Sequence, residues 1–231
     1  MSQPADLRSA DGAVRRIGLL GGSFDPPHLA HRALGRLAQQ TLALDELRWL
    51  PAGQPWQKAG QRLAEPAHRL AMLQALLDEA PGAGAECIDP RELQRQGPSY
   101  TIDTVLELRA EAAAAGRAVE LFLIIGQDQY GRIDTWQRWP ELLELVRLAV
   151  AAREGKMPCA PAALAERPGH HDPSRVHVLP LPRLDIAARD IRRRLAAGLA
   201  VDALVGPAVA GYIARHGLYR DPSDNDSPGT R

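Results

Sequence analysis

The sequence predicts an α/β protein built on a parallel, doubly wound sheet. Short apolar runs, typical of buried strands, alternate along the chain with longer segments of helical periodicity. The run at 119–125 is almost wholly apolar, as expected of a strand that helices cover on both faces. A turn rich in glycine and proline directly follows the first apolar run, and a helical pattern follows that turn. In open α/β sheets, such a strand–turn–helix unit lies where ligands bind.

The individual elements follow from periodicity and from helix start and stop signals. The helix at 66–80 carries its leucines on one face and ends at Pro81. The helix that opens at 98–104 can be capped by Ser99 or Thr101. The predicted strands are 17–20, 46–50, 85–89, 119–125, 145–152 and 175–179, and the predicted helices are 29–44, 66–80, one opening at 98–104, one entered over 184–192 and one over 206–217.

The length fits a single domain. We assign the domain to residues 15–219, with a disordered N-terminus at 1–14 and a disordered tail at 220–231. The segment 154–175 is rich in Pro, Ala and Gly, so it predicts a long loop.

Charge and cysteine content bound the location and the partners. The chain has 28 Lys and Arg residues against 28 Asp and Glu residues, so no overall field draws it to nucleic acid or to a membrane. No apolar run reaches the length of a membrane span, and the first residues lack the apolar core of a signal peptide. Cys87 and Cys159 are isolated, which is typical of free thiols in a reducing compartment. We therefore expect a cytoplasmic protein without nucleic-acid or membrane partners.

The segment GGSFDPPHLAH, residues 21–31, concentrates the chemistry-bearing side chains. Its glycines allow close approach of a bulky anion, and the following helix start offers free N–H donors to a phosphate. His28 and His31 lie three residues apart, so both can point to one side of that helix start and donate hydrogen bonds to a phosphate. The segment is neither a Walker loop nor a G-x-G-x-x-G turn, and a zinc site lacks a third ligand at suitable spacing. The alternative is a buried strand and turn followed by two surface histidines.

This segment resembles the signature of the nucleotidylyltransferase superfamily, His/Thr-x-Gly-His, and its longer form most resembles that of bacterial nicotinate-nucleotide adenylyltransferases. One departure is Ala30, which stands where that family has glycine. The resemblance covers Ile17 to about Leu218 and implies a Rossmann-like core with C-terminal helices. It further implies transfer of the adenylyl group of ATP to nicotinate mononucleotide, which gives deamido-NAD and pyrophosphate in NAD biosynthesis.

The resemblance also assigns phosphate-binding roles. His28 and His31 would steady the α-phosphate and the leaving pyrophosphate. Lys58, in a Pro-rich loop, and Arg192 would hold the triphosphate tail. Arg192 lies in a stretch that resembles the superfamily's Ile-Ser-Ser-Thr-x-Ile-Arg, although Ala187, Ala188 and Arg189 replace its hydroxyl residues. The residues expected to bind ATP are Gly21, Gly22, Ser23, Phe24, Lys58, Gly126, Asp128 and Arg153, where Asp128 would touch a ribose and Arg153 would lie near the adenine.

The acceptor site is expected at a second helix start. Tyr100 and Thr101 belong to a segment that resembles the family's Ser-Tyr-Thr-x-x-Thr, which helps to hold the pyridine nucleotide. A helix N-terminus suits a carboxylate, which nicotinate carries and nicotinamide lacks. By resemblance, Trp136 would stack on the pyridine ring.

The expected chemistry needs no protein nucleophile, because the 5′-phosphate of the mononucleotide is itself an anionic nucleophile. Mg²⁺ would arrive with ATP, held mainly by phosphate oxygens and water rather than by a protein site. Two alternatives stay open. One is the same transfer to another acceptor, such as nicotinamide mononucleotide or phosphopantetheine, and the other is a nucleotide-binding regulatory module without catalysis. The sequence does not report the oligomeric state.

Overall fold

A computed structural model describes residues 14–55, 63–79, 82, 84–153, 157–167, 175–182 and 184–220. Its centre is a six-stranded, wholly parallel sheet with the strand order β4-β2-β1-β6-β7-β8. The strands are β1 (Arg15–Gly22), β2 (Glu46–Pro51), β4 (Ala85–Ile88), β6 (Val119–Gly126), β7 (Arg147–Arg153) and β8 (Val176–Leu181), and a separate parallel pair joins β3 (Gln54–Pro55) to β5 (Pro98–Ser99).

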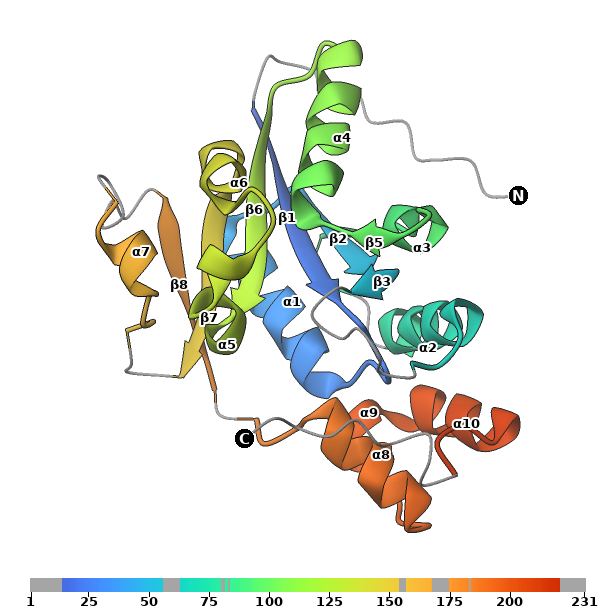
Figure 1. Cartoon of the computed structure of the whole chain (residues 1–231). Coiled ribbons are helices and arrows are strands. Elements are labelled where there is room, and N and C mark those ends of the chain that lie inside the picture. The colour runs from blue at the N-terminus through green and yellow to red at the C-terminus, as the bar shows by residue number, and fades with distance from the viewer. Residues whose placement is uncertain are drawn as a thin grey trace.

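Helices cover both faces of this sheet (Figure 1). The longer helices are α1 (Leu29–Leu42), α2 (Pro66–Glu79), α4 (Thr101–Ala114), α6 (Trp139–Leu145), α8 (Ala188–Ala196) and α10 (Pro207–His216). The short ones are α3 (Arg91–Gln94), α5 (Gln127–Tyr130), the 3₁₀ turn η2 (Ile133–Thr135), α7 (Ala162–Ala165) and α9 (Asp202–Val205). None of the helices in the described part of the chain is long and apolar enough to cross a membrane.

Alternation along the strands divides the core into two layers. In β6, Leu121 and Leu123 pack with α4 and α6 on one face, whereas Phe122 and Ile124 pack with α1 on the other. A third cluster joins α2 to the C-terminal helices through the buried side chains Met72, Leu76, Ile191, Val201, Val205, Val209, Ile213 and Tyr219. These C-terminal helices gather beyond the ends to which β1 and β6 point (Figure 1).

The predicted fold class and the six predicted strands are confirmed. The segment 154–175 is not loop throughout its described part, because it contains the single helical turn α7. Residues 1–13 and 221–231 lie outside the described residues, so the two predicted disordered ends stay predictions.

The strand order places a topological switch point between β1 and β6, where the connections turn in opposite directions. Leu20 of β1 pairs with Ile124 of β6, and two residues further on the strands reach Gly22 and Gly126. The two glycine-containing turns that the sequence singles out therefore lie side by side at the carboxyl edge of the sheet.

Candidate active site

The turn between β1 and α1, residues 21–28, is called the motif turn below. Phe24 adopts a left-handed φ of 48°, which buries its ring against Trp49 at 5.9 Å between centroids and against His31 at 5.1 Å. A Cβ on Gly22 would lie 3.1 Å from the Phe24 ring, so this glycine leaves room for the buried ring. The motif turn therefore packs its backbone directly against the buried ring of Phe24.

The two histidines of the motif stack on each other at the start of α1. Their ring centroids lie 3.7 Å apart, and the backbone N–H of His28 donates to Nδ1 of His31 over 3.2 Å. Because Nδ1 of His31 accepts this bond, a neutral His31 carries its proton on Nε2, where it can serve as a donor. Burial lowers the pKa of His28 to about 4, and its Nδ1 has no hydrogen-bond partner among the described residues. Near neutral pH, His28 is therefore an uncharged group held in a desolvated position.

Arg192 of α8 reaches the motif turn from far along the chain. Its Nη1 donates to the backbone carbonyl of Asp25 over 2.7 Å and lies 3.8 Å from the Asp25 carboxylate. Its Nε is buried without a hydrogen-bond partner in the described part of the chain. The arginine expected to bind the triphosphate thus lies beside the motif turn with donor capacity left over. On the same helix, Arg189 and Arg193 are exposed, and Arg193 pairs with Asp190.

Two buried residues outside the predicted site, Arg69 and Tyr219, hold the motif turn in place. Arg69 of α2 donates from Nη1 to the carbonyls of Ser23, over 2.9 Å, and Ala52, over 2.8 Å. Asp25 is 2% exposed and accepts a hydrogen bond from the Tyr219 hydroxyl over 2.6 Å. Local sequence gives no signal for these contacts, because Arg69 looks like an ordinary helical residue and Tyr219 lies 194 residues from Asp25.

The end of β6 supplies the other side of the switch point. Gly126 is the N-cap of α5, and a Cβ placed on it would meet no atom within 4 Å, so it faces open space. Asp128 lies exposed in the first turn of α5, available to a ligand at this edge. Arg153 ends β7 at the same edge, although its side chain lies outside what the structure describes, and Lys58 lies wholly outside the described residues.

The expected acceptor residues pack on the α4 side of the sheet. Tyr100 is the N-cap of α4, and Tyr100 and Trp136 both pack against the core cluster that includes Ile102. The expected capping by Ser99 or Thr101 is wrong, because Ser99 donates instead to the carbonyl of Glu92 over 3.1 Å, and the helix start has no side-chain cap. Nε1 of Trp136 is buried without a partner in the described residues.

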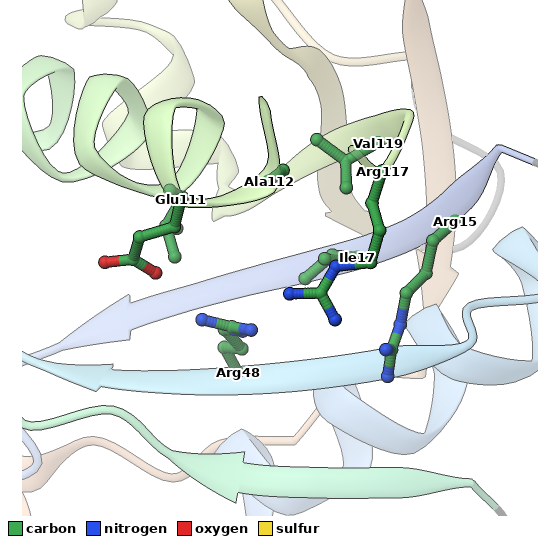
Figure 2. A pocket seen from close by; sticks show the side chains of 8 residues that line it. Arg15, Ile17, Arg48, Glu111, Ala112, Arg117 and Val119 are labelled. Atoms are coloured by element: carbon green, nitrogen blue, oxygen red, sulfur yellow. The ribbon is translucent and has the colours of Figure 1, made fainter. Parts of the chain in front are cut away.

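A small pocket at the opposite edge of the sheet is a separate feature (Figure 2). Figure 2 shows the guanidinium groups of Arg15, Arg48 and Arg117 around it. Glu46 lies 2.8 Å from Arg15 and 2.7 Å from Arg48, and Asp89 lies 3.4 Å from Arg48, so two carboxylates pair with two of the three arginines. The pocket lies at the strand starts, away from the switch point, and does not belong to the candidate site.

No group of three or more His, Cys, Asp or Glu side chains is placed to hold a metal ion in the part of the chain that the structure describes. The donors that converge on the motif turn are instead N–H groups of histidine and arginine, which suit anions. The described residues of the site can therefore bind and orient phosphate groups, and they form no metal-binding cluster of their own.

Comparison with known proteins shows which family the chain belongs to. A cytidylyltransferase-like family model matches residues 19–194. A probable nicotinate-nucleotide adenylyltransferase of Methylibium petroleiphilum is 46% identical over 212 aligned residues, covering 90% of this chain and 94% of that protein. The corresponding protein of Bordetella petrii is 46% identical over 207 residues, covering 90% of this chain and 100% of that protein.

A similar fold also occurs among solved structures. The nicotinic acid mononucleotide adenylyltransferase of Plasmodium falciparum complexed with NaAD matches with a TM-score of 0.68, over 89% of this chain and 97% of that chain. The identity is 18%, so this likeness concerns the fold.

Proposed function

Because the chain belongs to the cytidylyltransferase-like family, and within it to the nicotinate-nucleotide adenylyltransferases, we propose that it transfers the adenylyl group of ATP to nicotinate mononucleotide. The products are deamido-NAD (nicotinate adenine dinucleotide) and pyrophosphate. The observation that carries the proposal is the convergence of the stacked pair His28 and His31 with Arg192 on one turn at the switch point.

The reaction is a single displacement at the α-phosphorus. An oxygen of the mononucleotide's 5′-phosphate forms a bond to that phosphorus, the bond to the oxygen that bridges to the β-phosphorus breaks, and pyrophosphate leaves with the electron pair. Catalysis then rests on positioning and on stabilising negative charge, because the nucleophile is already ionised. His31, which carries its proton on Nε2 when neutral, donates to the α-phosphate or to the leaving group. His28, stacked on the His31 ring, would steady the same phosphate groups.

The remaining contacts divide between the two substrates. Arg192 would hold the triphosphate with the N–H groups that its bond to the Asp25 carbonyl leaves over, and Lys58 would assist it. Gly126 and Asp128 would lie against the nucleoside, at the end of β6. The uncapped start of α4 at Tyr100 and Thr101 would receive the nicotinate carboxylate, because its backbone N–H groups favour an anion. Trp136 would stack on the pyridine ring.

Mg²⁺ would be bound by the phosphate oxygens of ATP and by water, since the described residues form no metal cluster. When bound, it neutralises phosphate charge. The predicted cytoplasmic location stays a prediction.

The test is pyrophosphate release from ATP and Mg²⁺ with three acceptors in parallel: nicotinate mononucleotide, nicotinamide mononucleotide and phosphopantetheine. We expect kcat/KM to be highest with the nicotinate nucleotide, because only its carboxylate complements the α4 N-terminus. A preference for either other acceptor would overturn the assigned substrate while keeping the transfer chemistry. Binding of ATP without pyrophosphate release from any acceptor would favour a regulatory module.

A further inference from the structure

The carboxylate of Asp25 is buried within the motif turn and takes no part in the proposed chemistry. Its Oδ1 accepts hydrogen bonds from the Tyr219 hydroxyl, over 2.6 Å, and from the backbone N–H of Ala64, over 3.2 Å. Its Oδ2 accepts no hydrogen bond in the described part of the chain, and Nη1 of Arg192 lies 3.8 Å away. A buried carboxylate is costly unless it is paired, so each of these neighbours matters to the turn.

Tyr219 is held in an unusual conformation to reach Asp25. It lies just past α10 with a left-handed φ of 61°, and its side chain is 4% exposed within the third core cluster. A bulky residue at positive φ is disfavoured and persists only where its surroundings fix it. Burial and the nearby Asp25 carboxylate raise the pKa of Tyr219, so its hydroxyl keeps its proton and remains a donor across the working pH range.

We infer that Tyr219 is a positioning residue of the active site, which acts through Asp25 to keep Arg192 available for the triphosphate of ATP. Arg192 has two competing anionic partners once ATP binds: the phosphates and the Asp25 carboxylate 3.8 Å away. The Tyr219 hydroxyl donates to Asp25 Oδ1, so among the described residues Arg192 makes its hydrogen bond to the Asp25 carbonyl, stays 3.8 Å from the carboxylate and keeps its buried Nε for the ligand. The expected effect on KM rests on the proposed function, because it needs the transfer reaction. The expected effect on the Kd of ATP does not, because it needs only ATP binding.

Removal of the Tyr219 hydroxyl should change how Arg192 divides between the Asp25 carboxylate and the phosphates of ATP. Asp25 would keep only the Ala64 N–H on Oδ1, and the under-satisfied carboxylate would draw the Arg192 guanidinium toward itself. The cost should fall on ATP, which Arg192 contacts, and not on the acceptor, which binds at α4. We expect Tyr219→Phe to weaken ATP binding about tenfold, the range expected when one charge-assisted hydrogen bond is lost, with the KM for the acceptor nearly unchanged.

The matched control is Tyr212→Phe. Tyr212 lies on α10 close to Tyr219 in sequence, and its hydroxyl is 3.0 Å from Nδ1 of His68, so this variant also removes one hydroxyl contact from the C-terminal helices. It should leave both KM values and the ATP affinity as in the wild type. Both variants keep an aromatic ring in place, and thermal melting checks that each is folded at the assay temperature.

The decisive measurements are the Kd of ATP by calorimetry and the two KM values, in Tyr219→Phe, Tyr212→Phe, Asp25→Asn and the double variant Asp25→Asn/Tyr219→Phe. If Tyr219 acts through Asp25, its substitution adds little to the ATP Kd once Asp25 is neutral, so the double-mutant cycle is strongly non-additive.

Any of three outcomes would overturn the inference. Tyr219→Phe could bind ATP as tightly as the wild type, Tyr212→Phe could lose as much ATP affinity as Tyr219→Phe, or the effects of the two substitutions on the ATP Kd could add up in the cycle. If the wild type binds ATP but transfers nothing, the proposed function fails, whereas the four Kd values still decide the role of Tyr219.

Discussion

His28 and His31 lie in contact at the residue scale, yet their environments give them different tasks. His31 accepts from the His28 backbone through Nδ1, so a neutral His31 carries its proton on Nε2, the donor that we propose for phosphate. We predict that His31→Ala lowers kcat by on the order of 100- to 10,000-fold, because the donor to the reacting phosphate is gone, and circular dichroism should show an intact fold.

His31→Asn separates structure from chemistry at this position. The asparagine oxygen can still accept from the His28 N–H, so the start of α1 should remain stable while the imidazole is lost. Its turnover should stay as low as that of His31→Ala, with a melting temperature closer to the wild type. Near-normal turnover in either variant would refute the catalytic role.

The burial of His28 makes a pH-dependent contribution to stability. Its folded pKa of about 4 lies below the ordinary value of 6.5, so the unfolded chain binds the proton more readily. The contribution of His28 to the free energy of unfolding is therefore complete above about pH 6.5 and is lost as the pH falls toward 4, by about 3 kcal/mol for this group.

Urea unfolding at pH 4.5, 5.5 and 7.0 tests this contribution. In His28→Asn the free energy of unfolding should fall less steeply over this range than in the wild type, because the buried imidazole is gone. Parallel curves for the wild type and His28→Asn would contradict a buried, neutral His28.

At the element scale, two glycines in turns near the carboxyl edge differ in the space that a side chain would have. A Cβ on Gly53, after β2, would lie 2.0 Å from the backbone oxygen of Glu92, whereas one on Gly126, after β6, meets nothing within 4 Å. We predict that Gly53→Ala destabilises the fold by about 2 kcal/mol or more, because backbone must move. Gly126→Ala should melt like the wild type but raise the KM for ATP, since the methyl group would enter the open space where we propose that the nucleotide binds.

Melting curves and ATP kinetics on both variants check this pair. A stable Gly53→Ala, or a Gly126→Ala with wild-type ATP kinetics, would show that the corresponding constraint is absent. The two glycines are matched controls for each other, because the same methyl group is added at two turns of one sheet edge.

Element type was predictable from sequence where an element is long enough to show a period. The run at 119–125 and the helix at 66–80 carry clear patterns, and both form close to the predicted bounds. Single turns such as α3 and α7 span four residues, which is too short to show helical periodicity. The cap of α4 was missed because Ser99 has a competing acceptor, the Glu92 carbonyl, that only the fold brings near.

At the scale of the whole molecule, the site depends on contacts between distant parts of the chain. The motif at residues 21–31 was predictable because its residues are adjacent in sequence. The contacts of Asp25 with Arg192 and Tyr219 span 167 and 194 residues, so no local pattern encodes them. The third core cluster holds both Arg192 and Tyr219 in place, since it contains Tyr219 itself and Ile191, the neighbour of Arg192. The C-terminal helices therefore place Arg192 and Tyr219 against the motif turn, the proposed ATP site.

This dependence predicts a coupling between packing and binding. Ile213 of α10 is 2% exposed in the third cluster, and Ile213→Ala should lower the free energy of unfolding by about 2–5 kcal/mol through the cavity it leaves. It should also weaken ATP binding, because Arg192 and Tyr219 are held by the same cluster.

The matched control is Leu108→Ala, in the first cluster on α4, which should cost similar stability and leave the ATP Kd unchanged. Urea unfolding with and without ATP measures both quantities, since a bound ligand adds stability that grows with the logarithm of its affinity. Equal loss of ATP affinity in the two variants would mean that general loosening, and not the C-terminal packing, controls the site.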